Sequence, residues 1–153
     1  MSSHVVELRM ADPRAIAAVR ARLPIADVPA RFAEFLNEVY TAGRRGAVVL
    51  DGQNIFVYRD GPDGVADVEF GVGTTAPFAP VGPVQYTALP AGEAAATTHW
   101  GDYAGLRNAH AAVLEWCRRE GRQCAGPRWE VYGHWNDDPS QRRTDVYHLL
   151  RGG

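Results

Sequence analysis

The sequence predicts an α+β fold made of two pseudo-symmetric βαββ repeats. The first observation is that a pair of strand segments in the first half recurs in the second half. The second is that each half carries one amphipathic helix, and the two helices are expected to end at Gly43 and Gly121. A duplicated unit of this kind predicts an antiparallel sheet, two helices packed on one face and a central ligand cleft between the repeats. The recurring segments are Phe56-Val57-Tyr58 with Asp67-Val68-Glu69-Phe70, and Glu130-Val131-Tyr132 with Asp145-Val146-Tyr147-His148.

Repeat one is expected over residues 4–72. Two extended segments, residues 5–10 and 16–22, precede the first helix. That helix is predicted to begin at Asp27, with Pro29 in its first turn, because both residue types are favoured at those positions. Its apolar residues have the spacing of one helical face. They are Val28, Phe32, Phe35, Leu36 and Val39.

The second part of repeat one is expected to form strands. Gly43 is predicted to end the helix in a left-handed conformation. Residues 47–50 and 54–59 flank Asp51-Gly52, a dipeptide typical of a hairpin turn. After a polar loop, residues 65–72 are predicted to form the last strand of the repeat.

Repeat two is expected over residues 84–150, after a connector at residues 73–83 that is rich in Gly, Pro and Thr. The connector is too short for a flexible tether, so residues 1–153 are predicted to be one domain. Extended segments are expected at residues 84–89 and 93–99.

The second helix is predicted to begin at Asp102 and to end at Gly121. One face of it is expected to carry Tyr103, Leu106, His110, Val113, Leu114 and Cys117. Residues 129–135 and 144–150 then close a hairpin through a polar loop.

Composition excludes several classes of protein. The net charge of −2 leaves no basic face large enough to hold nucleic acid by neutralising phosphates, so direct nucleic-acid binding is not expected. The longest apolar run is far shorter than the ~20 residues that span a bilayer, so no membrane association is expected. The N-terminus lacks the pattern of a signal peptide, and a cytoplasmic location is predicted. A monomer or a weak homodimer is expected.

Familiar catalytic and metal-binding motifs are missing from the sequence. His110 falls on the apolar helix face and is interpreted as a core residue, whereas the strand histidines lack ligand spacing. Cys117 and Cys124 do not have the spacing of a metal site and are interpreted as two reduced thiols. The serines are terminal or lie in a polar loop, which argues against a serine triad. No metal, no cofactor and no nucleotide is therefore expected.

Strand alternation selects Glu130 as the candidate functional residue. Glu130 and Tyr132 share one face of their strand, and Phe56 and Tyr58 occupy the matching face in repeat one. If the helices cover the opposite face, which carries Val57 and Val131, then these four side chains face the cleft. A carboxylate among aromatic rings suits a flat organic cation, or a general acid–base whose pKa burial raises.

An alternative interpretation is that Glu130 faces water or pairs with Arg128 or Arg143. Trp100 and Tyr103 lie where the second repeat turns from strand to helix, and they either wall the cleft or belong to the core or its rim. The candidate ligand-binding residues are Phe56, Tyr58, Trp100, Tyr103, Trp129, Glu130, Tyr132 and Tyr147.

The second half resembles the GyrI-like family over residues 84–150, and the first half fits through the internal repeat. Each motif is weak alone, but their order and spacing are moderately specific. The chain departs from many members at residues 47–50, where they have a second Gly-Pro turn. The resemblance rests on His99-Trp100-Gly101-Asp102-Tyr103-Ala104-Gly105-Leu106, Leu114-Glu115-Trp116, Gly121, Gly126-Pro127-Arg128-Trp129-Glu130-Val131-Tyr132 and Thr144-Asp145-Val146-Tyr147.

This resemblance implies a cleft that binds bulky aromatic, often cationic, compounds. It places the family's cleft glutamate on Glu130 and the partner tyrosine on Tyr132. Family members occur behind DNA-binding modules in multidrug-sensing transcription regulators, as stand-alone proteins, as hydrolases of cyclopropane natural products and as a gyrase inhibitor. The leading hypothesis is a stand-alone small-molecule-binding protein.

Two alternatives remain open from the sequence. The first is a hydrolase of strained electrophiles in which Glu130 orients or deprotonates water and Tyr132 stabilises the developing oxygen charge. The second is a protein-interaction module that acts on gyrase or on a separate regulator.

Overall fold

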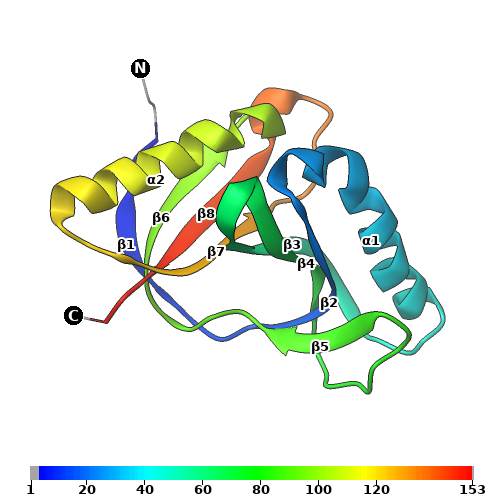
Figure 1. Cartoon of the computed structure of the whole chain (residues 1–153). Coiled ribbons are helices and arrows are strands. Elements are labelled where there is room, and N and C mark those ends of the chain that lie inside the picture. The colour runs from blue at the N-terminus through cyan, green and yellow to red at the C-terminus, as the bar shows by residue number, and fades with distance from the viewer. Residues whose placement is uncertain (1–3, 153) are drawn as a thin grey trace. The chain divides into compact units, whose positions relative to one another are not determined.

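The computed structural model describes residues 4–152. These residues form two compact units. The N-terminal unit is residues 13–89, and the C-terminal unit combines residues 90–152 with residues 4–12. Each unit is a four-stranded antiparallel sheet with one α-helix against it, as Figure 1 shows, which confirms the predicted α+β class.

In the N-terminal unit the strand order is β5-β2-β4-β3. Helix α1 follows β2 and contacts β2 and β4. The elements are β2 (Ala15–Pro24), α1 (Val28–Arg44), β3 (Leu50–Asp60), β4 (Val65–Thr74) and β5 (Val84–Ala88), with short 3-10 helices at Ile25–Asp27 and Pro62–Gly64.

In the C-terminal unit the strand order is β1-β6-β8-β7. Helix α2 follows β6 and contacts β6 and β8, which it overlies in Figure 1. The elements are β1 (Glu7–Ala11), β6 (Gly92–Trp100), α2 (Leu106–Glu120), β7 (Cys124–Tyr132) and β8 (Arg143–Leu150), with short 3-10 helices at Tyr103–Gly105 and Pro139–Gln141.

The two repeats exchange their first strands. β1 opens the first repeat but pairs with β6, where Glu7 lies opposite Ala96. β5 opens the second repeat but pairs with β2, where Ala88 lies opposite Ala15. Each compact unit is therefore a βαββ core completed by the short strand of the other repeat.

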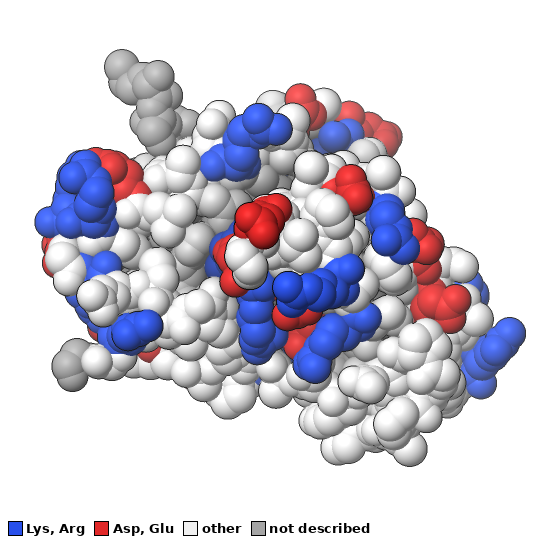
Figure 2. Space-filling view, viewed as in Figure 1, with Lys and Arg blue, Asp and Glu red and all other residues white. Residues whose placement is uncertain are grey.

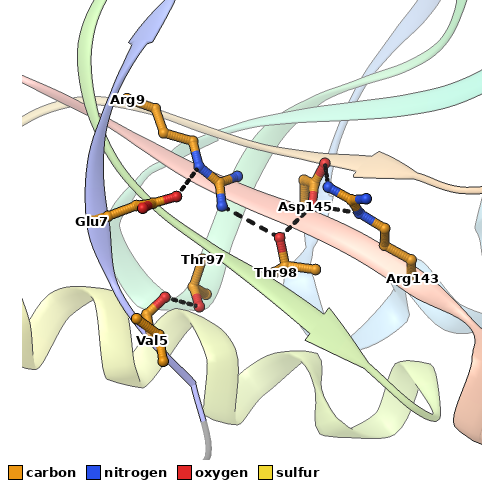
Figure 3. A network of polar contacts seen from close by, with 7 residues as sticks. All are labelled: Val5, Glu7, Arg9, Thr97, Thr98, Arg143 and Asp145. Carbon is orange, nitrogen blue, oxygen red and sulfur yellow. Dashed lines mark hydrogen bonds and ion pairs between the residues drawn. The ribbon is translucent and has the colours of Figure 1, made fainter.

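Polar contacts hold β1 on the C-terminal unit, as Figure 3 shows. Arg9 on β1 donates to Glu7 at 2.9 Å and to the Thr98 hydroxyl on β6 at 3.3 Å. Thr98 in turn donates to Asp145 on β8 at 2.7 Å. Ahead of β1, the backbone carbonyl of Val5 accepts a hydrogen bond from Thr97 at 2.7 Å. These contacts link the first residues of the chain to two later strands.

The helices cover the sheet face opposite to the one that the sequence analysis assumed. In the N-terminal unit, Phe32 of α1 contacts Phe56 of β3 with ring centroids 5.9 Å apart. In the C-terminal unit, Val146 packs with the buried residues of α2 and lies opposite Glu130 in the ladder. The expectation that the helices cover Val57 and Val131 is therefore wrong. Both sheet faces bury side chains, so apolar residues at alternate positions do not identify the face that contacts the helix.

Two local predictions for repeat one are also wrong. Helix α1 continues through Gly43 to Arg44, and the left-handed glycine is Gly46, with φ of 79°. Gly43 instead leaves room for Leu50, whose side chain would have to shift because a Cβ at residue 43 would lie 2.6 Å from Leu50 Cδ1. The expected hairpin at Asp51-Gly52 is an irregularity within the single strand β3. In repeat two, Gly121 caps α2 in the left-handed conformation, with φ of 66°, as predicted.

Strand pairing also changes which residues of the two repeats are equivalent. Asp67-Val68 of β4 corresponds to Asp145-Val146 of β8, and Val68 pairs with Tyr58 whereas Val146 pairs with Glu130. Glu130 therefore occupies the place of Tyr58, two residues from the place of Phe56 that the sequence repeat indicates. Within residues 4–152, no helix is long and apolar enough to cross a membrane.

Candidate functional site

The candidate site in the C-terminal unit is centred on Glu130 of β7. Its side chain lies on the face that α2 covers, and the residue is only 4% exposed. The Tyr132 hydroxyl, two residues along the same strand, donates to Glu130 Oε1 at 2.5 Å. His110 Nε2 lies 2.8 Å from Oε2 and carries the proton of this contact, because an ionised carboxylate only accepts. Each carboxylate oxygen thus has a fixed donor.

A second histidine extends this contact into a chain. His110 Nδ1 lies 2.8 Å from Nε2 of His148, which is 4% exposed on β8. When His110 is neutral with its proton on Nε2, its Nδ1 accepts from His148; when His110 is cationic, Nδ1 donates. The hydrogen-bonded chain Tyr132–Glu130–His110–His148 can therefore pass a proton along its length.

The partners of Glu130 control its charge. Burial alone would raise the pKa of Glu130, but the hydrogen bond and charge of His110, the Tyr132 hydroxyl and the charge of Arg128 together lower that pKa below its ordinary value. The site therefore holds a buried carboxylate that is ionised at neutral pH.

Aromatic side chains adjoin this carboxylate. Tyr103, in the 3-10 helix before α2, contacts Tyr132 edge to face with ring centroids 5.5 Å apart. Trp135 lies 6.3 Å from Tyr103, and the Arg142 guanidinium lies over the Trp135 ring at 3.8 Å. Tyr103 and Trp135 are 39% and 63% exposed, so these rings connect the buried Glu130–Tyr132 pair to the surface.

A buried hydroxyl lies beside the same group. Thr144 of β8 is fully buried and pairs with Tyr132 in the ladder, so the two side chains share a face. Its Oγ1 has no hydrogen-bond partner among residues 4–152. The hydroxyl is therefore a buried polar group close to the Glu130–Tyr132 pair.

The structure brings together only some of the predicted site residues. Glu130, Tyr132 and Tyr103 form one group. Trp129 and Tyr147 lie on the other face of the same sheet, where their rings stack 5.3 Å apart at 8°.

Three predicted residues remain, one at the end of β6 and two in the N-terminal unit. Trp100 ends β6 and is 57% exposed, with the Arg143 guanidinium 5.9 Å from its ring. Phe56 and Tyr58 belong to the N-terminal unit, on the α1 side of its sheet.

Sequence analysis missed His110, His148, Thr144, Trp135 and Arg142. His110 was interpreted as a core residue, yet an ionisable group on an apolar helix face requires a buried polar partner. Glu130 and His148, each on a strand of the same repeat, are the partners that could have been sought. Trp135 and Arg142 lie in the segment between β7 and β8, which leaves no periodic signal, and Thr144 lies on β8 as a neutral residue that no motif marks as functional.

The described chain contains no ready-made metal centre. Within residues 4–152, no group of three or more His, Cys, Asp or Glu side chains is placed to hold an ion. Cys117 and Cys124 are free thiols, and burial together with Cys124 raises the pKa of Cys117 to about 11, which keeps it protonated and unreactive at neutral pH.

These features define a duplicated βαββ domain with a buried acidic group. The chain belongs to the GyrI-like family, because the family model for the GyrI-like small molecule binding domain matches residues 4–151. It is thus a small-molecule-binding domain by family. No sequence match was found among curated proteins.

Solved structures with the same fold are similar to this chain at low sequence identity. The C-terminal domain of EcmrR is 20% identical, with a TM-score of 0.79 over 99% of this chain and 100% of that domain. SAV2435 bound to tetraphenylphosphonium is 11% identical, with a TM-score of 0.70 over 97% of this chain and 94% of the other. A hydrolase from Listeria innocua is 12% identical, with a TM-score of 0.60 over 95% of this chain and 91% of the other. At these identities the likeness shows the fold alone.

Proposed function

We propose that this chain binds a bulky aromatic cation and that Glu130 supplies the negative charge that holds it. The observation that carries this proposal is an ionised carboxylate, 4% exposed, whose pKa is lowered by His110 and Tyr132. The ionised carboxylate brings a negative charge into this buried group. A cation within a few ångströms is strongly attracted there because the local dielectric is low.

Further observations support an aromatic ligand that the site can orient. Tyr103 and Tyr132 offer ring faces and edges for stacking and for cation–π contacts, beside the Trp135 ring that the Arg142 guanidinium covers. The Thr144 hydroxyl offers a buried polar group for orientation. SAV2435, which shares the fold, was solved with tetraphenylphosphonium, a ligand of this class.

Titration with tetraphenylphosphonium, followed by tryptophan fluorescence, tests the proposal. Wild-type protein should show saturable quenching, because Trp135 belongs to the aromatic group. Glu130→Gln keeps the shape and removes the charge, and should weaken binding about tenfold or more, which is roughly 1.4 kcal/mol. Triphenylphosphine oxide, a neutral aromatic of similar bulk, should bind both proteins equally.

Glu115→Gln is the matched control, because Glu115 is an exposed carboxylate on α2 that pairs with Arg118. It should leave the affinity unchanged. Equal affinity of wild type and Glu130→Gln for the phosphonium would contradict the assignment of Glu130. Absence of quenching in wild type would contradict the ligand class.

A second candidate function is hydrolysis of a strained electrophile. The chain Tyr132–Glu130–His110–His148 favours it, because a base linked to two imidazoles can take a proton from water and pass it on. Turnover of a cyclopropane electrophile that Glu130→Gln abolishes and His148→Gln slows would support it. Stoichiometric binding without product would leave ligand binding as the function.

A further inference from the structure

The N-terminal unit has a charged hollow on the sheet face that is turned away from α1. The hollow has a volume of about 420 Å³ and is lined by Arg20 of β2, Arg59 of β3, and Asp67 and Glu69 of β4. These residues share a face, because Arg20 pairs with Glu69 and Arg59 pairs with Asp67 in the ladders. Figure 2 shows blue and red side chains gathered over the region of β2, β3 and β4 that Figure 1 labels.

Glu69 is the buried member of this group, and only one of its two carboxylate oxygens accepts a described hydrogen bond. It is 3% exposed. Its Oε2 accepts from Arg20 at 3.1 Å and from Arg59 at 3.3 Å. Its Oε1 is buried and has no hydrogen-bond partner among residues 4–152. A charged oxygen out of contact with water is costly without a donor, so the geometry calls for an N–H or O–H group at Oε1.

Arg20 and Arg59 each have more N–H donors than the one that contacts Glu69. Arg20 and Arg59 are 62% and 45% exposed at their side chains, and both give their described contact to the same oxygen, Glu69 Oε2. A guanidinium has five N–H donors in a planar fork that matches a carboxylate. The hollow therefore has the Glu69 carboxylate in its lining, with Oε1 buried below the surface, and a pair of cationic forks beside it.

We propose that this hollow binds a small amino-carboxylate zwitterion, such as a free amino acid. A turn of the Glu69 carboxylate brings Oε1 to the hollow, where the ammonium group donates to it, and the ligand carboxylate lies against Arg20 and Arg59. A simple anion would leave Oε1 without a donor and would be repelled by the Glu69 carboxylate. A simple cation would not use the guanidinium donors and would be repelled by their positive charges. The residues that line the site all belong to the N-terminal unit, and Glu130 is not among them.

Three small probes on the wild-type protein separate these contributions in an NMR titration. Glycine carries both groups and should give saturable shifts of the Glu69 amide and of the Arg20 and Arg59 side-chain N–H signals. Acetate lacks the ammonium group. Glycine betaine keeps both charges, but its methylated nitrogen has no N–H to donate. Neither acetate nor betaine should reproduce the saturable shifts.

Glu69→Gln should weaken glycine binding about tenfold, because the amide at this position loses the charge that attracts the ammonium group. Glu34→Gln, which alters an exposed carboxylate on α1 paired with Arg31, is the matched control and should have no effect. Glu130→Gln should also leave glycine binding unchanged.

Two results would overturn the proposal. The first is no saturable shift with glycine up to molar concentration. The second is an equal response to glycine, acetate and betaine, which would mean that Oε1 takes no part and that the group is only a surface ion pair. The three-probe comparison needs no variant, so it stays decisive even where Glu69→Gln fails to fold.

Discussion

Equivalent strand positions in the two units carry opposite kinds of side chain on the helix-covered face. In the N-terminal unit, β4 presents Phe70, which stacks on Phe35 of α1 at 4.8 Å and meets Phe56 edge to face at 5.1 Å. In the C-terminal unit the position of Phe70 is taken by His148, which contacts His110 of α2. An aromatic core under one helix corresponds to a polar chain under the other.

The opposite sheet face shows the reverse arrangement. In the C-terminal unit, Trp129 and Tyr147 lie across the β7–β8 ladder and stack on each other. The equivalent pair in the N-terminal unit is Val57 and Glu69, and Glu69 is the buried carboxylate of the charged hollow. Each unit thus buries one glutamate and one aromatic cluster, on opposite faces.

The difference shows how a duplicated fold can bury a carboxylate on either face of its sheets. The βαββ frame needs an apolar cluster to hold its layers together, and each unit has one. The remaining face can then accept a buried carboxylate, provided that basic or hydroxyl groups surround it. Glu130 has partners on both oxygens, whereas Glu69 has partners on one, and this contrast suggests different ligands.

The largest expected effect comes from breaking the aromatic core of the N-terminal unit. Phe70→Ala should lower the free energy of unfolding by about 3–5 kcal/mol, because Phe70 is fully buried and its removal leaves a cavity beside Phe35 and Phe56. Urea unfolding measures the change. Phe32→Ala is the control, since Phe32 is 37% exposed and should cost clearly less. Similar losses for both variants would mean that this cluster is not the core of the unit.

Sequence reasoning could reach the strands and the helices, because each rests on local periodicity or on a motif, and it selected Glu130 as a candidate in the same way. It could not reach the exchange of β1 and β5, since short strands with half-exposed residues carry no signal for their partner. The face that the helices cover was assigned wrongly because Val57 and Phe56 are both buried, although they lie on opposite faces of the strand. Alternation identifies the covered face only when one face is apolar and the other is polar. Glu69 was seen only as part of a repeated strand.

A smaller loss is expected when the buried carboxylate of the C-terminal unit loses a donor. His110→Leu should lower the free energy of unfolding at pH 7 by about 2–3 kcal/mol, because Glu130 Oε2 then has no His110 proton while Tyr132 still serves Oε1. Urea unfolding of both proteins gives the difference. Arg118→Leu, on the exposed surface of the same helix, should change stability far less.

The loss of stability in His110→Leu should depend on pH, and the pKa of Glu130 sets the direction of that dependence. In wild type the pKa of Glu130 is lowered on folding, so its contribution is present above the ordinary carboxyl pKa of about 4.3 and is lost as the pH falls through the folded value. In His110→Leu, burial dominates and raises the pKa of Glu130, so the folded variant binds a proton at mildly acid pH. The stability gap should therefore narrow as the pH falls from 7 towards about 4. A gap that is constant with pH would show that His110 acts by packing alone.

The smallest effect is expected at the rim of the charged hollow. Arg20→Gln should lower the free energy of unfolding by less than about 1 kcal/mol, because its guanidinium is largely exposed and Arg59 still donates to Glu69 Oε2. The same substitution should abolish the saturable glycine shifts, because the carboxylate of glycine then meets one guanidinium in place of two. Measuring stability and glycine binding on one variant separates the two roles of the ion pair. A loss of stability as large as that of His110→Leu would mean that the Arg20–Glu69 contact is structural, and the contrast between a complete and an incomplete carboxylate site would then fail.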